Sequence, residues 1–277
     1  MARLIELKQG NLRVLIAPDN GGMIAQILVD EVPVLKLDES ALEITPMSAG
    51  GCPVLFPFAG KVSESSYDWD GKTYTMPAHG LVKNAPFAVR YHDEAMLVLW
   101  RSGCRSEAAN YPFDYDLELV YRLEDGALYT VARIHNLSSR PMPHAMAWHP
   151  YFKATQKERL RFCHRMKVHY DYIKIQDEPA AEKLDLSEWY DDVFHTPAEP
   201  GFSLENPVDG YGVRCMPDGH YPVMVVCSWV DGAVCIEPWC GIPDSIKNGR
   251  FLQIVPPGQT QQLVVMWTFS KGGCTNE

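Results

Sequence analysis

Apolar residues recur at every second position along much of this chain, which is the period of a β-strand rather than of a helix. Between Asp116 and Leu123 the alternation is regular, and Asp125-Gly126 follows before a second alternating run at 127–135. An Asp-Gly pair between two such runs is typical of a tight hairpin, because both central residues take a positive φ. The segment therefore predicts two antiparallel strands.

The same Asp-Gly device occurs twice more, at Asp70-Gly71 and Asp231-Gly232, each between short apolar or aromatic runs. Three predicted hairpins indicate antiparallel sheet. Further strands are expected where β-branched, aromatic and alternating residues gather. They lie at residues 3–8, 12–17, 23–29, 96–100, 166–175, 221–229, 251–255 and 261–269.

Helical periodicity is nearly absent, and the best candidate is a short turn at 187–192. The 21 prolines and 20 glycines are spread along the chain, so no linker marks a domain boundary. We therefore expect an all-β protein: a single large antiparallel β-sandwich that forms one domain over residues 1–277. The least regular segment, 178–209, is predicted to be a functional loop.

The charge balance is acidic, with 35 Asp and Glu against 25 Lys and Arg, a net charge of −10. Such a balance disfavours nucleic acid and anionic membranes as partners, since both are bound through phosphates. No apolar run approaches the roughly 18 residues of a spanning helix, and the first residues lack the apolar core of a signal peptide. The eight cysteines show neither a disulfide framework nor a paired zinc motif. We expect a cytoplasmic protein with reduced thiols.

Two basic residues occupy glycine-rich segments that can approach a ligand closely. Lys61 ends the Pro- and Gly-rich run at 50–60, and His79 is followed by Gly80, which lets the backbone come near a ligand. The alternative is structural: a solvated lysine at a wide turn, and a histidine that is only hydrogen-bonded within its loop.

Two further residues suit proton transfer. His149 lies among aromatic residues and before Pro150, and an imidazole held in this way can exchange a proton near neutral pH. Glu237 ends an apolar run at 233–236, where burial raises the pKa of a carboxyl group toward that of a useful base. The alternatives are an aromatic core corner for His149 and a solvent-facing strand end for Glu237.

A metal site is an alternative to this proton-transfer chemistry, with His79, His144, His149 and Glu237 as its ligands. No close His-x-His pair exists, and His144 and His149 are five residues apart, which on a strand places them on opposite faces. No Ser or Cys stands in a nucleophile turn, and no Gly-rich phosphate loop precedes a helix. We therefore expect no metal.

Four short motifs occur in one order along the chain. They are Gly51-Cys52-Pro53-Val54-Leu55-Phe56-Pro57 with Gly60-Lys61, then His79-Gly80-Leu81-Val82-Lys83-Asn84, His149-Pro150-Tyr151-Phe152 and Glu237-Pro238-Trp239-Cys240-Gly241. Together they resemble the aldose 1-epimerases, the galactose mutarotase family, over essentially the whole chain. The fold of that family is a single large antiparallel β-sandwich, in agreement with the predicted hairpins.

The resemblance implies an isomerase that interconverts the α and β anomers of a free aldose without a metal or organic cofactor. It implies that His149 is the acid that protonates the ring oxygen and that Glu237 is the base that takes the proton of the C1 hydroxyl. His79 matches a histidine that hydrogen-bonds the sugar near its ring oxygen. Asp191 matches an aspartate that binds sugar hydroxyls, with Asp192 as its rival.

Two departures from the family pattern bear on the substrate. Lys61, followed by Val62, stands where the family usually has Arg, often followed by Asn, and the second motif ends in Lys83 where Arg is common. A lysine keeps the positive charge but lacks the planar fork that grips two oxygens at once. The sugar preference is therefore open, and Lys61 and Lys83 are predicted sugar-binding residues.

Several readings remain beside a neutral-hexose mutarotase. A mutarotase for a phosphorylated or sulfonated hexose would use Lys61, Lys83 and Arg90 as anion contacts. A sugar-binding or sensing protein would keep the site without turnover, and a glycosidase would want two carboxylates flanking the bond. The sequence leaves monomer and homodimer equally open.

Overall fold

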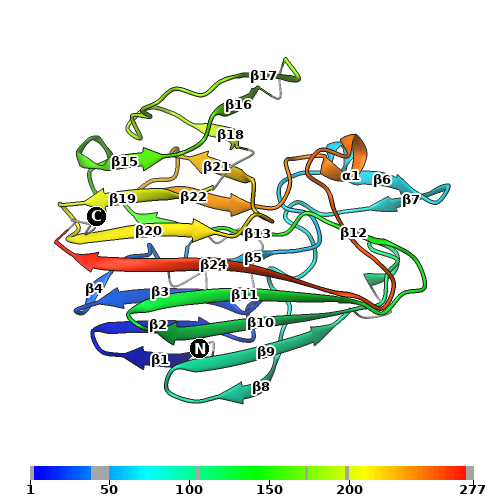
Figure 1. Ribbon diagram of the computed structural model, residues 1–277, viewed down its shortest axis with the longest axis horizontal. Helices are drawn as coiled ribbons and strands as arrows, with labels where there is room; N and C mark the ends of the chain where they lie inside the picture. Colours follow the sequence, from blue (N-terminus) through cyan, green and yellow to red (C-terminus); the bar gives the residue numbers. More distant parts are fainter. Residues whose placement is uncertain (1–2, 39–49, 104–106, 172–173, 197–199, 273–277) are drawn as a thin grey trace.

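β-Strands dominate the structure and form two eight-stranded antiparallel sheets and three smaller ones (Figure 1). The computed structural model describes residues 3–38, 50–103, 107–171, 174–196 and 200–272. The antiparallel all-β prediction is confirmed. Among the described residues, no helix has the length and apolar character needed to cross a bilayer.

The first large sheet, called here the long sheet, contains the longest strands of the molecule. In spatial order its strands are β15 (Arg161–His164), β19 (Phe202–Asn206), β20 (Tyr211–Pro217), β24 (Thr260–Lys271), β11 (Ala127–Asn136), β10 (Tyr115–Glu124), β9 (Met96–Ser102) and β8 (Ala88–His92).

The second large sheet, called here the site sheet, lies beside the long sheet at the top of Figure 1. In spatial order its strands are β17 (Gln176–Pro179), β16 (Val168–Asp171), β18 (Asp191–His195), β21 (Val223–Cys227), β22 (Ala233–Trp239), β13 (Ala147–Trp148) and β5 (Val54–Leu55), and β14 (Tyr151–Lys153) also pairs with β22.

The smaller elements complete the molecule. A four-stranded sheet packs against the long sheet, with β1 touching β10 and β3 touching β24. The elements are β1 (Ile5–Gln9), β2 (Leu12–Ala17), β3 (Met23–Val29) and β4 (Val32–Pro33), the hairpin β6 (Ser66–Trp69) and β7 (Lys72–Thr75), the pair β12 (Met142–His144) and β23 (Gln253–Val255), and the helix α1 (Ser245–Asn248). Two 3₁₀ turns occupy Ser63–Ser65 and Lys157–Arg159.

One large cluster of buried apolar side chains draws on the four-stranded sheet, the long sheet and the site sheet. In β22, Val234 and Ile236 belong to this core, whereas Cys235 and Trp239 belong to smaller clusters. Since alternate residues of a strand project to opposite faces, β22 turns Cys235, Glu237 and Trp239 away from the main core. We call this side of the site sheet the site face.

Most of the local predictions agree with the structure. Each of the further strands expected from the sequence overlaps an observed strand, with ends that differ by a few residues. The hairpins at Asp70-Gly71 and Asp125-Gly126 are two-residue turns with a positive φ at every central residue. The tight hairpin at Asp231-Gly232 is wrong, because five residues, 228–232, connect β21 and β22, although these strands do pair.

Two predictions for the segment 178–209 are also wrong. The helical turn at 187–192 is not formed: Ser187 donates a hydrogen bond to Asp185 in a local turn, and β18 begins at Asp191. The segment is not an irregular loop either, since it contains β18 and β19. Pairing of β18 with both β16 and β21 supplies the backbone hydrogen bonds that local sequence does not reveal.

Candidate active site

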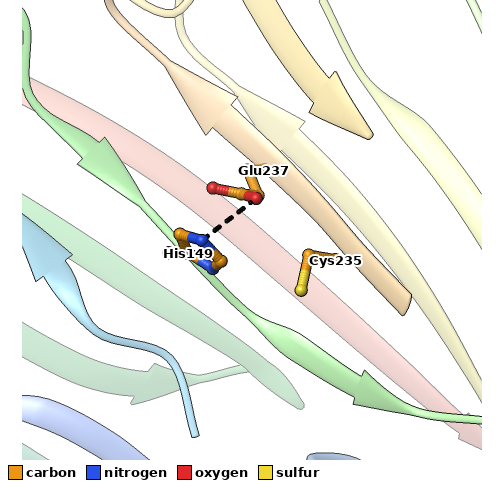
Figure 2. Close-up of side chains that lie close together, drawn as sticks. All are labelled: His149, Cys235 and Glu237. Carbon is orange, nitrogen blue, oxygen red and sulfur yellow. Dashed lines mark ion pairs between the residues drawn. The ribbon is translucent and has the colours of Figure 1, made fainter. Parts of the chain in front are cut away.

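Strand register brings an imidazole and a carboxylate into contact on the site face. β22 pairs with β13 through Ala147 and Trp239, and with β14 through Tyr151 and Cys235. His149 is midway between these pairings and therefore stands opposite Glu237. Its Nε2 lies 3.3 Å from the Glu237 Oε1 (Figure 2).

The chain around His149 fixes the ring. The His149 N–H donates a hydrogen bond to the Pro53 carbonyl at 3.0 Å, which ties the segment to the first motif. The imidazole stacks on Tyr151, with ring centroids 4.7 Å apart and planes inclined by 17°. Its side chain is 12% exposed, so solvent reaches the ring while its orientation is restrained.

Glu237 is almost completely enclosed, with a side chain that is 1% exposed. The Trp239 Nε1–H donates to its Oε2 at 2.8 Å, which holds the carboxyl group in place. Burial raises the pKa of Glu237 well above its ordinary value, although the Trp239 hydrogen bond opposes the rise. The negative charges of Cys227 and Asp191 add to it.

Burial acts in the opposite direction on His149, because the charged form of an imidazole is the protonated one. It lowers the pKa of His149 well below the ordinary 6.5, and the positive charges of His79 and Lys83 add to the effect. Burial thus makes the Glu237 carboxylate a stronger base, and the protonated His149 a stronger acid, than the free side chains. Such a pair suits proton transfer in both directions.

His79 stands against this pair, with its ring centroid 5.5 Å from that of His149. Its backbone has a φ of 68°, and its Nδ1 accepts a hydrogen bond from the Gly60 N–H at 3.3 Å. This bond places the ring proton on Nε2. Burial lowers the pKa of His79 to about 4, helped by the charges of Lys83 and Lys61, so the ring is a neutral donor.

Three further predicted site residues, Lys83, Lys61 and Asp191, act electrostatically on His79 or Glu237. Burial lowers the pKa of the half-buried Lys83, and both Lys83 and Lys61 act electrostatically on His79. Burial raises the pKa of Asp191, as does Asp192, whereas Lys61 opposes the rise. Lys61 thus lies near both His79 and Asp191.

Strand pairing distinguishes Asp191 from Asp192. Asp191 is opposite Cys227, and Cys227 is opposite Cys235, so Asp191 projects from the site face. Asp192 projects from the other face, where its Oδ1 lies 2.8 Å from the Nε2 of His169. Of the two, the structure brings Asp191 to the His149–Glu237 pair.

Two residues considered at the sequence level lie elsewhere. His144 is fully buried at the end of β12, with its Nε2 2.7 Å from the Gln261 Oε1. Arg90 lies over the Trp100 ring and 3.8 Å from Glu118, at the far edge of the long sheet (Figure 1). The metal set that included His144 and the anion contact at Arg90 are therefore not supported by this geometry.

Sequence reasoning missed Cys235 and the structural part played by Trp239. One donor atom from each of His149, Cys235 and Glu237 lies within 4.8 Å of the others. The signal was present, since Cys235, Glu237 and Trp239 are alternate residues of one strand and so share a face.

The arrangement of the sheets defines a class: proteins of the galactose mutarotase-like fold. A family model described as aldose 1-epimerase matches residues 3–266, and the chain belongs to that family.

Similar proteins come from several bacteria. The protein YphB of Escherichia coli K12 is 25% identical over 294 aligned positions, which cover 92% of this chain and 94% of YphB. The Slr1438 protein of Synechocystis superposes with a TM-score of 0.90 at 24% identity, covering 98% of this chain and 96% of that one. A galactose mutarotase related enzyme of Lactobacillus acidophilus superposes with a TM-score of 0.84 at 20% identity, covering 98% of each chain.

Proposed function

We propose that this protein interconverts the α and β anomers of an aldohexose, with His149 as the general acid and Glu237 as the general base. The observation that carries the proposal is their contact of 3.3 Å in a chain of the aldose 1-epimerase family. Burial moves the pKa values of the two groups in opposite directions, which makes the His149 imidazolium a stronger acid and the Glu237 carboxylate a stronger base.

The reaction balances with proton transfers alone. In the reactive form His149 is protonated and Glu237 is ionised. The His149 imidazolium donates a proton to the ring oxygen, the C1–O5 bond breaks, and the Glu237 carboxylate takes the proton of the C1 hydroxyl. Rotation about C1–C2 then presents the other face of the aldehyde to the O5 hydroxyl. Ring closure returns the O5 proton to His149 and the Glu237 proton to O1, which restores both groups and gives the other anomer.

Four residues are proposed to bind the sugar. His79 offers a neutral Nε2–H beside His149, which suits a hydrogen bond to an oxygen near the reacting centre. Lys61 and Lys83 offer cationic donors, and Asp191 offers a carboxylate on the site face. Donors and acceptors of this kind match the hydroxyl groups of a sugar.

The test is anomer exchange of freshly dissolved α-glucose and α-galactose, followed by polarimetry or NMR. Glu237→Gln and His149→Asn should each lower turnover at least about a hundredfold, because each removes a proton-transfer group. The matched controls Glu118→Gln and His135→Asn change the same residue types on the long sheet and should leave turnover unchanged. Near-normal rates in either site variant would remove that residue from the reaction.

A phosphorylated or sulfonated hexose is the second candidate substrate. The supporting observation is that Lys61 and Lys83 both place positive charge around His79. No acceleration of any sugar by the unmodified protein, with sugar binding still detectable, would instead favour a sugar-sensing protein.

Lys61→Ala is expected to weaken sugar binding more than it slows turnover. Loss of one charged hydrogen bond corresponds to roughly a tenfold rise in KM. Measuring kcat and KM for glucose and for glucose 6-phosphate separates the candidates, since an anionic sugar should lose more affinity. An unchanged KM for both would place Lys61 outside the binding site.

A further inference from the structure

The site face carries a third polar group that the proposed reaction does not use. Cys235 precedes Glu237 by two residues on β22, so its thiol projects toward the same side. One donor atom from each of His149, Cys235 and Glu237 lies within 4.8 Å of the others (Figure 2). Cys235 is fully buried, and Glu237 nearly so.

Imidazole, thiolate and carboxylate groups are the ligands that borderline-soft divalent cations bind. Zn²⁺ binds imidazole nitrogen, thiolate sulfur and carboxylate oxygen at about 2.0–2.3 Å in tetrahedral geometry. Donors at that radius are about 3.3–3.8 Å apart. The Nε2 of His149 and the Oε1 of Glu237, 3.3 Å apart, already meet this spacing.

Closing a separation of up to 4.8 Å to this spacing requires the Cys235 thiol to approach by about 1–1.5 Å at most. The neighbouring groups favour such a rearrangement. The Nδ1 of His149 is buried without a hydrogen-bond partner among the described residues, so the ring can tilt without breaking a bond there.

We propose that His149, Cys235 and Glu237 form a site for a thiophilic divalent cation of the zinc class, and that its occupation inhibits the enzyme. The Cys235 S–H proton and any proton on the His149–Glu237 pair pass to solvent as the metal–ligand bonds form, and the fourth position stays open to water. Binding would occupy the lone pairs with which His149 and Glu237 exchange protons. The inhibition, but not the binding, rests on the proposed function.

Metal content after dialysis of the whole protein against Zn²⁺ tests the site directly. Unmodified protein should retain about one more zinc ion per chain than Cys235→Ser, with an affinity at least about tenfold higher. Cys215→Ser is the matched control, since Cys215 is a buried thiol on β20 of the long sheet and lies outside the three-residue set. Cys163→Ser controls for binding by an exposed thiol.

Cd²⁺ provides a second readout that does not depend on activity. Its thiolate charge-transfer absorption should appear in the unmodified protein and in both controls, and be lost in Cys235→Ser. His149→Asn, in which the thiol is intact, should also bind zinc more weakly. Equal zinc and cadmium binding by the unmodified protein and Cys235→Ser would overturn the site.

Inhibition is measured as the rate of anomer exchange with and without Zn²⁺. Zinc should slow the unmodified protein, EDTA should restore the rate, and Cys235→Ser should resist zinc. Equal inhibition of both proteins would overturn the inhibitory role. Specific zinc binding in a protein that accelerates no sugar would leave the metal site standing and reject the proposed function.

Discussion

Burial sets the chemistry of the residues at the centre of the site. Leaving water destabilises the anion of a carboxyl group and the cation of an imidazole, so burial raises the pKa of Glu237 and lowers that of His149. The carboxylate becomes a stronger base and the imidazolium a stronger acid than the free side chains.

The raised pKa of Glu237 makes the stability of the fold depend on pH. Because the pKa of Glu237 is raised above 4.5 in the folded state, its contribution is complete below pH 4.5 and is lost as the pH rises through the raised value. Glu237→Gln cannot ionise and is expected to unfold with a free energy about 1–4 kcal/mol higher at pH 8. The gain should shrink toward pH 4.5.

Urea unfolding of both proteins at several pH values measures this difference. A constant difference between Glu237→Gln and the unmodified protein at every pH would contradict a raised pKa at Glu237.

The motifs were enough to predict His79, His149 and Glu237, and the structure places them together. They did not distinguish Asp191 from Asp192, which are adjacent in sequence and project from opposite faces of β18. They also gave no reason to connect Cys235 with His149, because contact between the two depends on the pairing of β14 with β22.

At the scale of secondary-structure elements, the strands and their connections position the site residues. The alternation of β10 and β11 and their Asp-Gly turn were predictable, because the period and the turn chemistry are local. Short strands such as β5, β13 and β14 were not, since two or three residues show no period. Their place depends on pairing within the site sheet.

Gly80 shows how tightly the second motif is held against the first. The Cβ of an alanine there would lie 2.2 Å from the Phe56 carbonyl oxygen, and the φ is 81°. Gly80→Ala is expected to cost about 2 kcal/mol more than Gly71→Ala, whose φ is 72° but whose Cβ meets nothing within 4 Å.

Thermal and urea unfolding of the two glycine variants measure this difference. Gly80→Ala should also slow anomer exchange, because the same turn orients His79, whereas Gly71→Ala should not. Equal stabilities of the two variants would show that the Phe56 backbone moves away from the added Cβ without a loss of stability.

At the scale of the whole molecule, one buried cluster connects the four-stranded sheet, the long sheet and the site sheet. No group of strands could lose its packing without exposing the apolar faces of the others. We therefore expect one cooperative domain, in line with the sequence prediction for residues 1–277.

Cooperativity is tested by following urea unfolding with two probes. Far-ultraviolet circular dichroism reports all strands, whereas tryptophan fluorescence is weighted by buried indoles such as Trp148 in the site sheet and Trp267 in the long sheet. The two transitions should coincide. Separate midpoints would show that the sheets unfold as independent units.

The sequence by itself determined the class of fold, two of the three predicted hairpins and the four short motifs, because period, turn residues and motif identity are local properties. The tertiary structure decided which of these residues meet. The pairing register of β14 with β22 sets His149 opposite Glu237. Because alternate residues of a strand share one face, Asp191 rather than Asp192 projects from the site face, and the Cys235 thiol projects from the same face as Glu237. The physical reason is that contacts across a sheet depend on pairing between strands far apart in sequence, and no local pattern encodes that register.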